Sequence, residues 1–321
     1  MSLQNCRVVA SGVDPEAYHR TSEKRGTPTY PVSKSMLGDF AACPARWIRG
    51  YTRPETKALT NGSLWDGLLL TPEKFGEKYI ECPSQYPGAN GEMKPWTFQA
   101  TYCKSWREAN KGLEPVKSDD LEDARAAVAA VLENPDLEEM LRGAQKQVMV
   151  VGEWQDRATG LVIPVKALLD IVPAKAGPFR KMLLDFKTTR NASMRKWTRD
   201  CYDFGYGVQA AFHSDLYVAA TGEDRCCFGH IVQENVAPFH VEKRALTCEF
   251  ITLGRGQYMA ALKLYCQCLA TNKWPGYDAY IEIDGWQEVS PEAWMINAGD
   301  FREFSTATDE PQPAFASETP S

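Results

Sequence analysis

Three apolar runs in the middle of the chain constrain its fold most strongly. Each has the length and β-branched content of a strand, and they span Gln147–Trp154, Leu161–Val172 and Lys181–Phe186. Turn-forming residues separate the runs, at 158–160 and at 173–178. The sequence therefore predicts a sheet in which residues 147–187 supply adjacent strands.

Charged side chains at the ends of two of these runs are the candidates for chemistry. Asp170 and Asp185 each follow a pair of leucines, which places a carboxylate at the end of a buried run. Because side chains alternate along a strand, Asp185 and Lys187 point to one face and Phe186 to the other. Buried charge is costly unless it is paired or bound to a metal. Two carboxylates and a lysine that converge therefore predict a hydrolytic magnesium site.

A simpler interpretation of the same residues competes with this one. An Asp-x-Lys triplet is expected about once by chance in a chain of this composition. On a strand, such a pair is usually a solvated surface pair. The buried run before each aspartate favours the metal site.

The motif around these residues resembles that of a known group of enzymes. Asp170 with Asp185-Phe186-Lys187 is similar to the D…(D/E)xK signature of the PD-(D/E)XK nuclease superfamily. The surrounding sequence resembles phage-type exodeoxyribonuclease VIII (RecE-like) exonucleases. The similarity covers about residues 33–280 and includes Gly62–Phe75, Glu153 with Trp154, Tyr206–Phe212 and Trp274–Tyr277.

The resemblance implies a fold and an activity. The fold is a single α/β domain of the PD-(D/E)XK type, with a mixed central β-sheet flanked by helices. The activity is metal-dependent 5′→3′ exonuclease action on double-stranded DNA ends, which makes single-stranded DNA for phage-type recombination. The implied cofactor is Mg²⁺, with Mn²⁺ as a substitute. The implied partners are DNA ends, a single-strand annealing recombinase and further copies of the chain in a homo-oligomer.

Two alternatives remain open at this point. The chain could be a related endonuclease, or a single-strand or flap nuclease of the same superfamily. It could also be a DNA-binding or assembly protein whose catalysis is weakened.

Metal ligands follow from the resemblance. Asp170 and Asp185 would bind magnesium, and the main-chain carbonyl of Phe186 would be a further ligand. Glu153 and Asp66 would act as outer ligands or as ligands of a second metal, with Glu153 counted among the catalytic residues. Asp66 stands where the family usually has a histidine.

The remaining catalytic roles are also implied by the resemblance. Lys187 would position or activate water, and Gln209 would orient that water or hold the scissile phosphate. His213 stands where the family usually has a tyrosine, and Tyr217, one helical turn further on, could replace it.

The charge distribution bears on nucleic-acid binding. The net charge of −6 is wrong for a protein that coats DNA nonspecifically. However, residues 175–199 hold eight lysines and arginines against Asp185 as the one acid. A solvated cationic helix face would explain this run, but its position beside the carboxylates favours phosphate contacts. The candidate DNA contacts are Arg190, Arg195, Lys196, Arg199, His213 and Tyr217.

Local patterns predict the remaining organisation. Residues 1–30 read as a loose N-terminal arm, 31–300 as the exonuclease-like domain, and 301–321 as a disordered acidic, Pro-rich tail. Helices are expected over 62–70, 118–142, 206–221 and 250–271, and a hairpin over 226–245.

Composition suggests a compartment. No apolar run reaches the length of a membrane span, and no signal pattern occurs at the N-terminus. We therefore expect a cytoplasmic protein without membrane partners, in the bacterial host if the chain is phage-encoded. The ten cysteines lack the spacing of a metal cluster, so free thiols are expected.

Overall fold

The computed structural model describes residues 3–52, 54, 57–277, 282–283 and 286–287, with the backbone alone for 57–61, 282–283 and 286–287. It contains two units, Met1–Gly276 and Tyr277–Ser321. In the second unit, β11 (Glu282–Ile283) pairs antiparallel with β12 (Trp286–Gln287). The expected tail at 301–321 lies outside the described residues.

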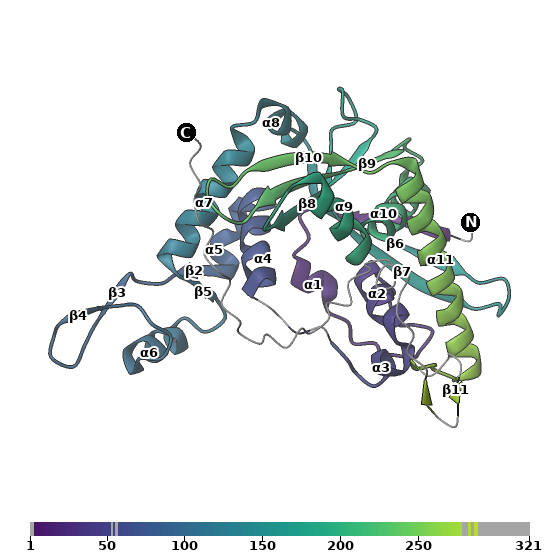
Figure 1. Cartoon of the computed structure of the whole chain (residues 1–321), viewed down its shortest axis with the longest axis horizontal. Coiled ribbons are helices and arrows are strands. Elements are labelled where there is room, and N and C mark those ends of the chain that lie inside the picture. The colour runs from purple at the N-terminus through teal and green to yellow at the C-terminus, as the bar shows by residue number, and fades with distance from the viewer. Residues whose placement is uncertain (1–2, 53, 55–56, 278–281, 284–285, 288–321) are drawn as a thin grey trace, which may run out of the picture. The chain divides into compact units, whose positions relative to one another are not determined.

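A six-stranded sheet forms the centre of the first unit, in the order β1-β6-β7-β8-β9-β10 (Figure 1). Neighbouring strands run antiparallel except β8 and β9, which are parallel, so the sheet is mixed. The predicted α/β class with a mixed central sheet is confirmed. The strands are β1 (Leu3–Ala10), β6 (Gln145–Gln155), β7 (Val162–Val172), β8 (Met182–Thr189), β9 (Cys227–Glu234) and β10 (Val241–Ala245).

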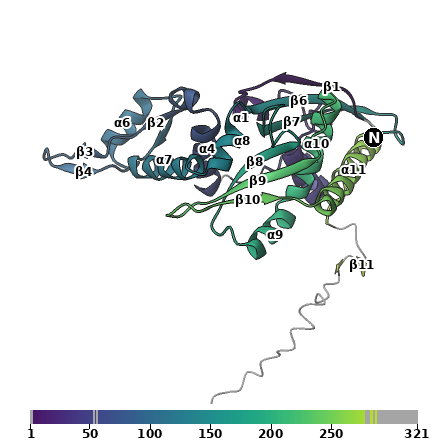
Figure 2. The ribbon, with the colours of Figure 1, turned by 90° about the horizontal axis from the view of Figure 1, so that it is seen from above.

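Helices cover both faces of this sheet (Figure 2). Apolar side chains of the strands and helices form one core on each face, and Phe186 belongs to the second core. The first face is covered by α2 (Lys34–Ala42), α3 (Pro44–Ile48), α10 (Tyr206–Thr221) and α11 (Cys248–Thr271). The second face is covered by α4 (Lys57–Leu70), α7 (Ser118–Leu132) and α8 (Pro135–Leu141).

Shorter elements complete the unit. None of the helices in the described part of the chain is long and apolar enough to cross a membrane. The short helices are α1 (Pro15–His19), η1 (Pro72–Lys74), α5 (Phe75–Lys78), α6 (Thr101–Ala109) and α9 (Met194–Asp203). The short strands are β2 (Tyr79–Glu81), β3 (Gln85–Pro87), β4 (Met93–Pro95) and β5 (Glu114–Val116).

The connection between β8 and β9 places α10 over the sheet. Parallel neighbours need a crossover, and α9 and α10 supply it. Gly205 and Gly222 bound α10 with φ of 63° and 70°, a left-handed conformation that glycine adopts without steric cost. The helix predicted at 206–221 is confirmed, and it lies next to the strand that carries Asp185.

The N-terminal residues differ from the prediction of a loose arm. Residues Leu3–Ala10 form β1, an edge strand that pairs with β6 and contacts α10. Tyr18 is buried, and its hydroxyl donates to the carbonyl of Lys166 at 3.1 Å. The prediction was wrong because the strand pairs with residues about 150 positions away, which a local pattern does not reveal.

The single helix expected over 118–142 is also corrected. It is two helices, α7 and α8, which meet at Asn134 and Pro135. The Asn134 side chain accepts from the amides of Asp136 and Leu137, and Pro135 occupies the first turn of α8. Asn134 and Pro135 therefore start a new helix. Proline has no backbone amide to donate the hydrogen bond that would continue α7.

Close contact between α10 and α11 depends on two glycines. A Cβ on Gly254 would lie 2.1 Å from the carbonyl atoms of Gly207, and one on Gly207 would lie 2.8 Å from the Phe250 carbonyl oxygen. These are backbone atoms, so the helices themselves would have to separate. Gly256 on the same helix has nothing within 4 Å of such a Cβ.

We expect Gly254→Ala to lower the free energy of unfolding by at least about 2 kcal/mol, because overpacking forces the two helices apart. The matched Gly256→Ala should be neutral or should stabilise by up to about 1 kcal/mol, through helix propensity. Urea unfolding of both variants measures the difference. Equal effects would mean that the helices do not need this close contact.

Candidate active site

Strands β7 and β8 separate at two facing aspartates. Their ladder contains the pair Ile171 and Leu184, and in the same register Asp170 and Asp185 come next to each other. At this point the amide of Phe186 donates to Asp170 Oδ2 at 3.1 Å. The hydrogen bond that a backbone carbonyl would accept in a regular strand ladder is therefore accepted by a side-chain carboxylate. Facing positions of this kind hold side chains about 5 Å apart at Cβ. The fold therefore brings both predicted carboxylates together.

Asp185 forms the centre of a buried polar group. Its side chain is 2% exposed, and its Oδ1 accepts from Gln209 Nε2 at 2.5 Å. Its Oδ2 lies 2.5 Å from Lys187 Nζ, which also donates to the Phe186 carbonyl at 3.4 Å. The structure thus gathers Asp185, Lys187 and Gln209, three of the residues predicted from the sequence.

The facing aspartates have opposite pKa shifts. Burial would raise the pKa of Asp185, but Lys187 and then His230 lower it to about 2. Burial and the charge of Asp185 hold the pKa of Asp170 well above its usual value. Burial would lower the pKa of Lys187, but Asp185 and Asp170 hold it above its usual value. Lys187 is therefore an ammonium at neutral pH, and of the two facing aspartates Asp170 is the one that favours its protonated form.

Asp66 is a third carboxylate in this group. Burial raises its pKa to about 7, while Lys187 lowers that pKa and Asp185 raises it. Asp66 and Ser63 line a cavity of about 420 Å³ between α4, α5 and the segment at 12–16. A second cavity, of about 270 Å³, lies beside α6 and contains none of these residues. Of the three carboxylates, Asp66 alone lines the larger cavity.

Buried rings surround the polar group. His230, on β9, is the register partner of Asp185, and its Nε2 lies 4.0 Å from Asp185 Oδ2. Its ring packs against Trp197 and Tyr206 at centroid distances of 5.3 Å each. Burial lowers the pKa of His230 and of His213 to about 4. Both histidines are therefore neutral at physiological pH.

The donor atoms suit a hard divalent cation. No group of three or more His, Cys, Asp or Glu side chains in the described residues is arranged to hold a metal. The available donors are the carboxylates of Asp170 and Asp185, with the Phe186 carbonyl beside them and Asp66 in electrostatic reach. These are all oxygen atoms, which Mg²⁺ prefers. A bound cation would also relieve the repulsion that raises the pKa of Asp170.

Comparison with known proteins places this site in a family. Residues 33–283 match the PDDEXK-like domain of unknown function, DUF3799. The chain belongs to this family. Its fold is also similar to the crystal structure of a "Putative exonuclease" from Eubacterium rectale, with 13% sequence identity, a TM-score of 0.52, and coverage of 90% of this chain and 99% of that chain. No curated protein matches. The predicted resemblance to the PD-(D/E)XK superfamily is confirmed.

Two residues of this PDDEXK-like site were not predicted from the sequence. Tyr206 lies with its ring centroid 5.6 Å from Lys187 Nζ, and burial raises the pKa of its hydroxyl to about 12. It begins the segment at 206–212 that carries the family resemblance, so a signal for it was present. His230 gave no local signal, because its contact with Asp185 depends on β9 lying parallel to β8.

Glu153 is not part of the group, and its expected role is corrected. It faces Pro164 across β6 and β7, six residues along the strand from Asp170, or about 20 Å. Its Oε2 accepts from Asn5 Nδ2 on β1 at 2.7 Å. The antiparallel register carries Glu153 to the opposite end of the sheet from the two aspartates.

His213 and Tyr217 were expected to contact DNA, and this too is corrected. They are 5% and 2% exposed, so neither can reach a nucleic acid. Tyr217 packs in the core and its hydroxyl donates to Glu223 Oε2 at 3.4 Å. Both lie on the part of α10 that faces the sheet.

The basic run is divided between two ends of β8. Lys175 and Lys181, before the strand, are paired with Glu223 and Asp224. The basic residues after the strand are exposed and begin at Arg190, three positions beyond Lys187, although Lys196 is paired with Asp200. The exposed residues are Arg190, Arg195, Lys196 and Arg199.

The neutral, buried His230 makes stability depend on pH. Unfolding would return its pKa from about 4 to the ordinary histidine value of 6.5, so the unfolded state binds the proton first as pH falls. The contribution of His230 to stability should therefore decline as pH falls from about 6.5 to about 4. A shift of this size corresponds to about 3 kcal/mol at most.

We expect His230→Phe, which suits the aromatic surroundings, to reduce this decline in metal-free protein. Free energies of unfolding in urea at pH 7 and pH 4.5 measure it. His240→Gln is the matched control, since His240 is exposed, and it should keep the wild-type dependence. The same dependence in both variants would show that His230 is not the titrating group.

Proposed function

We propose that this chain is a metal-dependent deoxyribonuclease that acts as a 5′→3′ exonuclease on double-stranded DNA ends. The observation that carries the proposal is the group Asp170, Asp185 and Lys187 at the point where β7 and β8 separate, within a PDDEXK-like domain. The name of the structurally similar E. rectale protein supports exonuclease action. Polarity rests on the sequence resemblance to RecE-like exonucleases.

In this proposal Asp170, Asp185 and the Phe186 carbonyl hold Mg²⁺, or Mn²⁺ in its place. The bound ion would supply positive charge to the phosphate and favour ionisation of water. Because its pKa is raised, Lys187 keeps its proton and acts as a donor. Its ammonium stabilises negative charge that develops on the phosphate oxygens.

Gln209 orients the attacking water. Its Nε2 is committed to Asp185 Oδ1, so its Oε1 remains to accept a hydrogen bond from the water. The water oxygen forms a bond to phosphorus and loses one proton to solvent as the bond to the leaving ester oxygen breaks. The leaving oxygen takes up one proton from solvent, so the net reaction adds one water across the phosphodiester.

The approach of DNA follows from the surface next to the site. Arg190, Arg195 and Arg199 are exposed directly after β8 and can contact phosphates without reading sequence. Assembly into a homo-oligomer and delivery of the product strand to an annealing recombinase extend the proposal, and both rest on the resemblance alone.

We expect Asp185→Asn and Lys187→Met each to slow DNA cleavage by about 100-fold or more, because each removes a group that acts on the reacting phosphate. Linear duplex labelled at the 5′ or 3′ end, with Mg²⁺, measures rate and polarity. Glu153→Gln should cleave at the wild-type rate, since the structure places Glu153 elsewhere. Full activity of folded Asp185→Asn would exclude this site.

The same assay separates the alternatives. Cleavage of closed circular duplex would show an endonuclease, and preference for single strands or flaps would show the related nuclease class. A wild-type protein that binds duplex without cleaving it under Mg²⁺ or Mn²⁺ would be a DNA-binding protein with this fold.

Asp66 allows a second test. As an oxygen donor in reach of Asp185, it should favour magnesium, so Asp66→His should shift the preference towards manganese. Asp66→Ala should weaken metal binding and slow cleavage less than Asp185→Asn does. Cleavage rates across Mg²⁺ and Mn²⁺ titrations measure both effects. Identical curves for wild type and Asp66→Ala would place Asp66 outside the site.

A further inference from the structure

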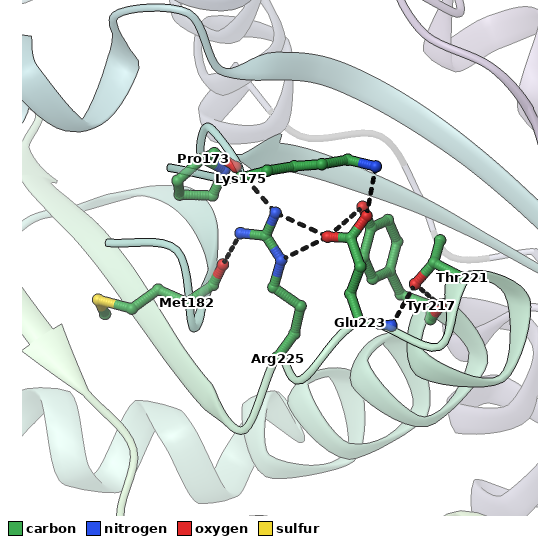
Figure 3. A network of polar contacts seen from close by, with 7 residues as sticks. All are labelled: Pro173, Lys175, Met182, Tyr217, Thr221, Glu223 and Arg225. Atoms are coloured by element: carbon green, nitrogen blue, oxygen red, sulfur yellow. Dashed lines mark hydrogen bonds and ion pairs between the residues drawn. The ribbon is translucent and has the colours of Figure 1, made fainter. Parts of the chain in front are cut away.

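A buried arginine joins the two strands that carry the catalytic aspartates. Arg225 is 2% exposed, and its guanidinium donates to two main-chain carbonyls. Nη2 reaches the Pro173 oxygen at 3.0 Å and Nη1 reaches the Met182 oxygen at 3.2 Å (Figure 3). Pro173 directly follows β7 and Met182 begins β8. One side chain therefore holds the end of one strand against the start of the next.

The partner of this arginine belongs to the end of α10. Glu223 Oε2 accepts from Arg225 Nε at 3.1 Å and from Nη2 at 2.9 Å (Figure 3). Glu223 also pairs with Lys175 at 3.0 Å and accepts from the hydroxyl of Tyr217. Its amide donates to Thr221 Oγ1 at 3.2 Å, which ties Glu223 to the C-terminal end of the helix just beyond the Gly222 cap. The guanidinium thus joins β7, β8 and α10.

These three elements carry the proposed active site. Asp170 lies three residues before Pro173, Asp185 lies three residues after Met182, and Gln209 is on α10. The β7–β8 ladder contains a single residue pair, so backbone bonds hold the strands together weakly near the aspartates. The two carbonyl contacts of Arg225 add a connection between β7 and β8 where their backbone ladder is short.

We propose that Arg225 is a positioning residue that sets the spacing of Asp170 and Asp185 for the metal. This inference rests on the proposed function for its role in catalysis. The geometry needs arginine, because a planar fork can donate to two carbonyls and a carboxylate at once. A lysine would keep the charge beside Glu223 but would not span all three acceptors. Arg225→Lys therefore tests the hydrogen-bond geometry of the guanidinium while the positive charge is kept.

The chain offers a matched control. Arg255 donates to Asp215 from Nε at 2.7 Å and from Nη2 at 2.8 Å, and Tyr258 donates to the same carboxylate at 2.6 Å. This pair joins α10 and α11 and, among the contacts of the described residues, touches no carbonyl of β7 or β8. Arg255→Met removes a similar ion pair away from the aspartates. The effects of Arg255→Met therefore measure what the loss of an arginine–aspartate ion pair does in general, away from the proposed site.

The experiment compares full-length Arg225→Lys, Arg225→Met and Arg255→Met with wild type. Calorimetric titration with Mn²⁺ measures metal affinity, and we expect at least a tenfold loss in both Arg225 variants. Hydrogen exchange of the Phe186 amide in metal-free protein should be at least tenfold faster, since its acceptor is Asp170. The rate constant for cleavage should fall at least tenfold with the KM for DNA unchanged. Arg255→Met should match wild type in all three.

The outcomes separate this inference from the proposed function. If the Arg225 variants match Arg255→Met in metal affinity and in exchange, Arg225 is structural and the inference is wrong. If Arg225→Met does not fold, Arg225→Lys alone decides. If wild type neither binds Mn²⁺ nor cleaves DNA, the proposed function fails. In that case unchanged Phe186 exchange in Arg225→Lys overturns the positioning role as well, and faster exchange retains it.

Discussion

The juxtaposition of two buried carboxylates is the constraint on which the rest of this structure depends. Asp170 and Asp185 face each other where burial and mutual repulsion both disfavour charge. Lys187 and Gln209 compensate Asp185, whereas Asp170 has the amide of Phe186. The sheet and the crossover helix α10 bring the two carboxylates together, and the contacts of the buried Arg225 lie at the same pair of strands. An arrangement with this electrostatic cost is consistent with the proposed binding of a cation.

Features that depend on neighbouring residues could be predicted from the sequence. Helix α10 has the predicted bounds because Gly222 ends it locally, and the hairpin of β9 and β10 follows from its own turn. The break between α7 and α8 had a local signal in Asn134 and Pro135, but the apolar pattern over 118–142 favoured one continuous helix. β1 had no local signal, because it pairs with β6, about 150 residues away in the sequence. Long-range pairing is decided by packing, which periodicity does not report.

The site divides in the same way. The convergence of Asp170, Asp185 and Lys187 could be predicted because strand alternation and the apolar residues before them are local. Glu153 was misplaced because strand register decides which end of the sheet a residue reaches. On α10, Gln209 reaches Asp185, but Tyr217 lies eight residues on, about 12 Å along the axis, beside Glu223. A shared helix face did not place both residues at one site.

Charge balance bears on how the proposed site would take up a cation. Three carboxylates and one ammonium meet, and the pKa of Asp66 is raised to about 7 while that of Asp170 is also raised. Near neutral pH the metal-free group therefore holds protons that a cation must displace, so metal binding and proton release are coupled. Lys187 cannot relieve this, because its charge is already engaged by Asp185. A divalent ion satisfies Asp170 and Asp66 together, which one lysine beside Asp185 does not.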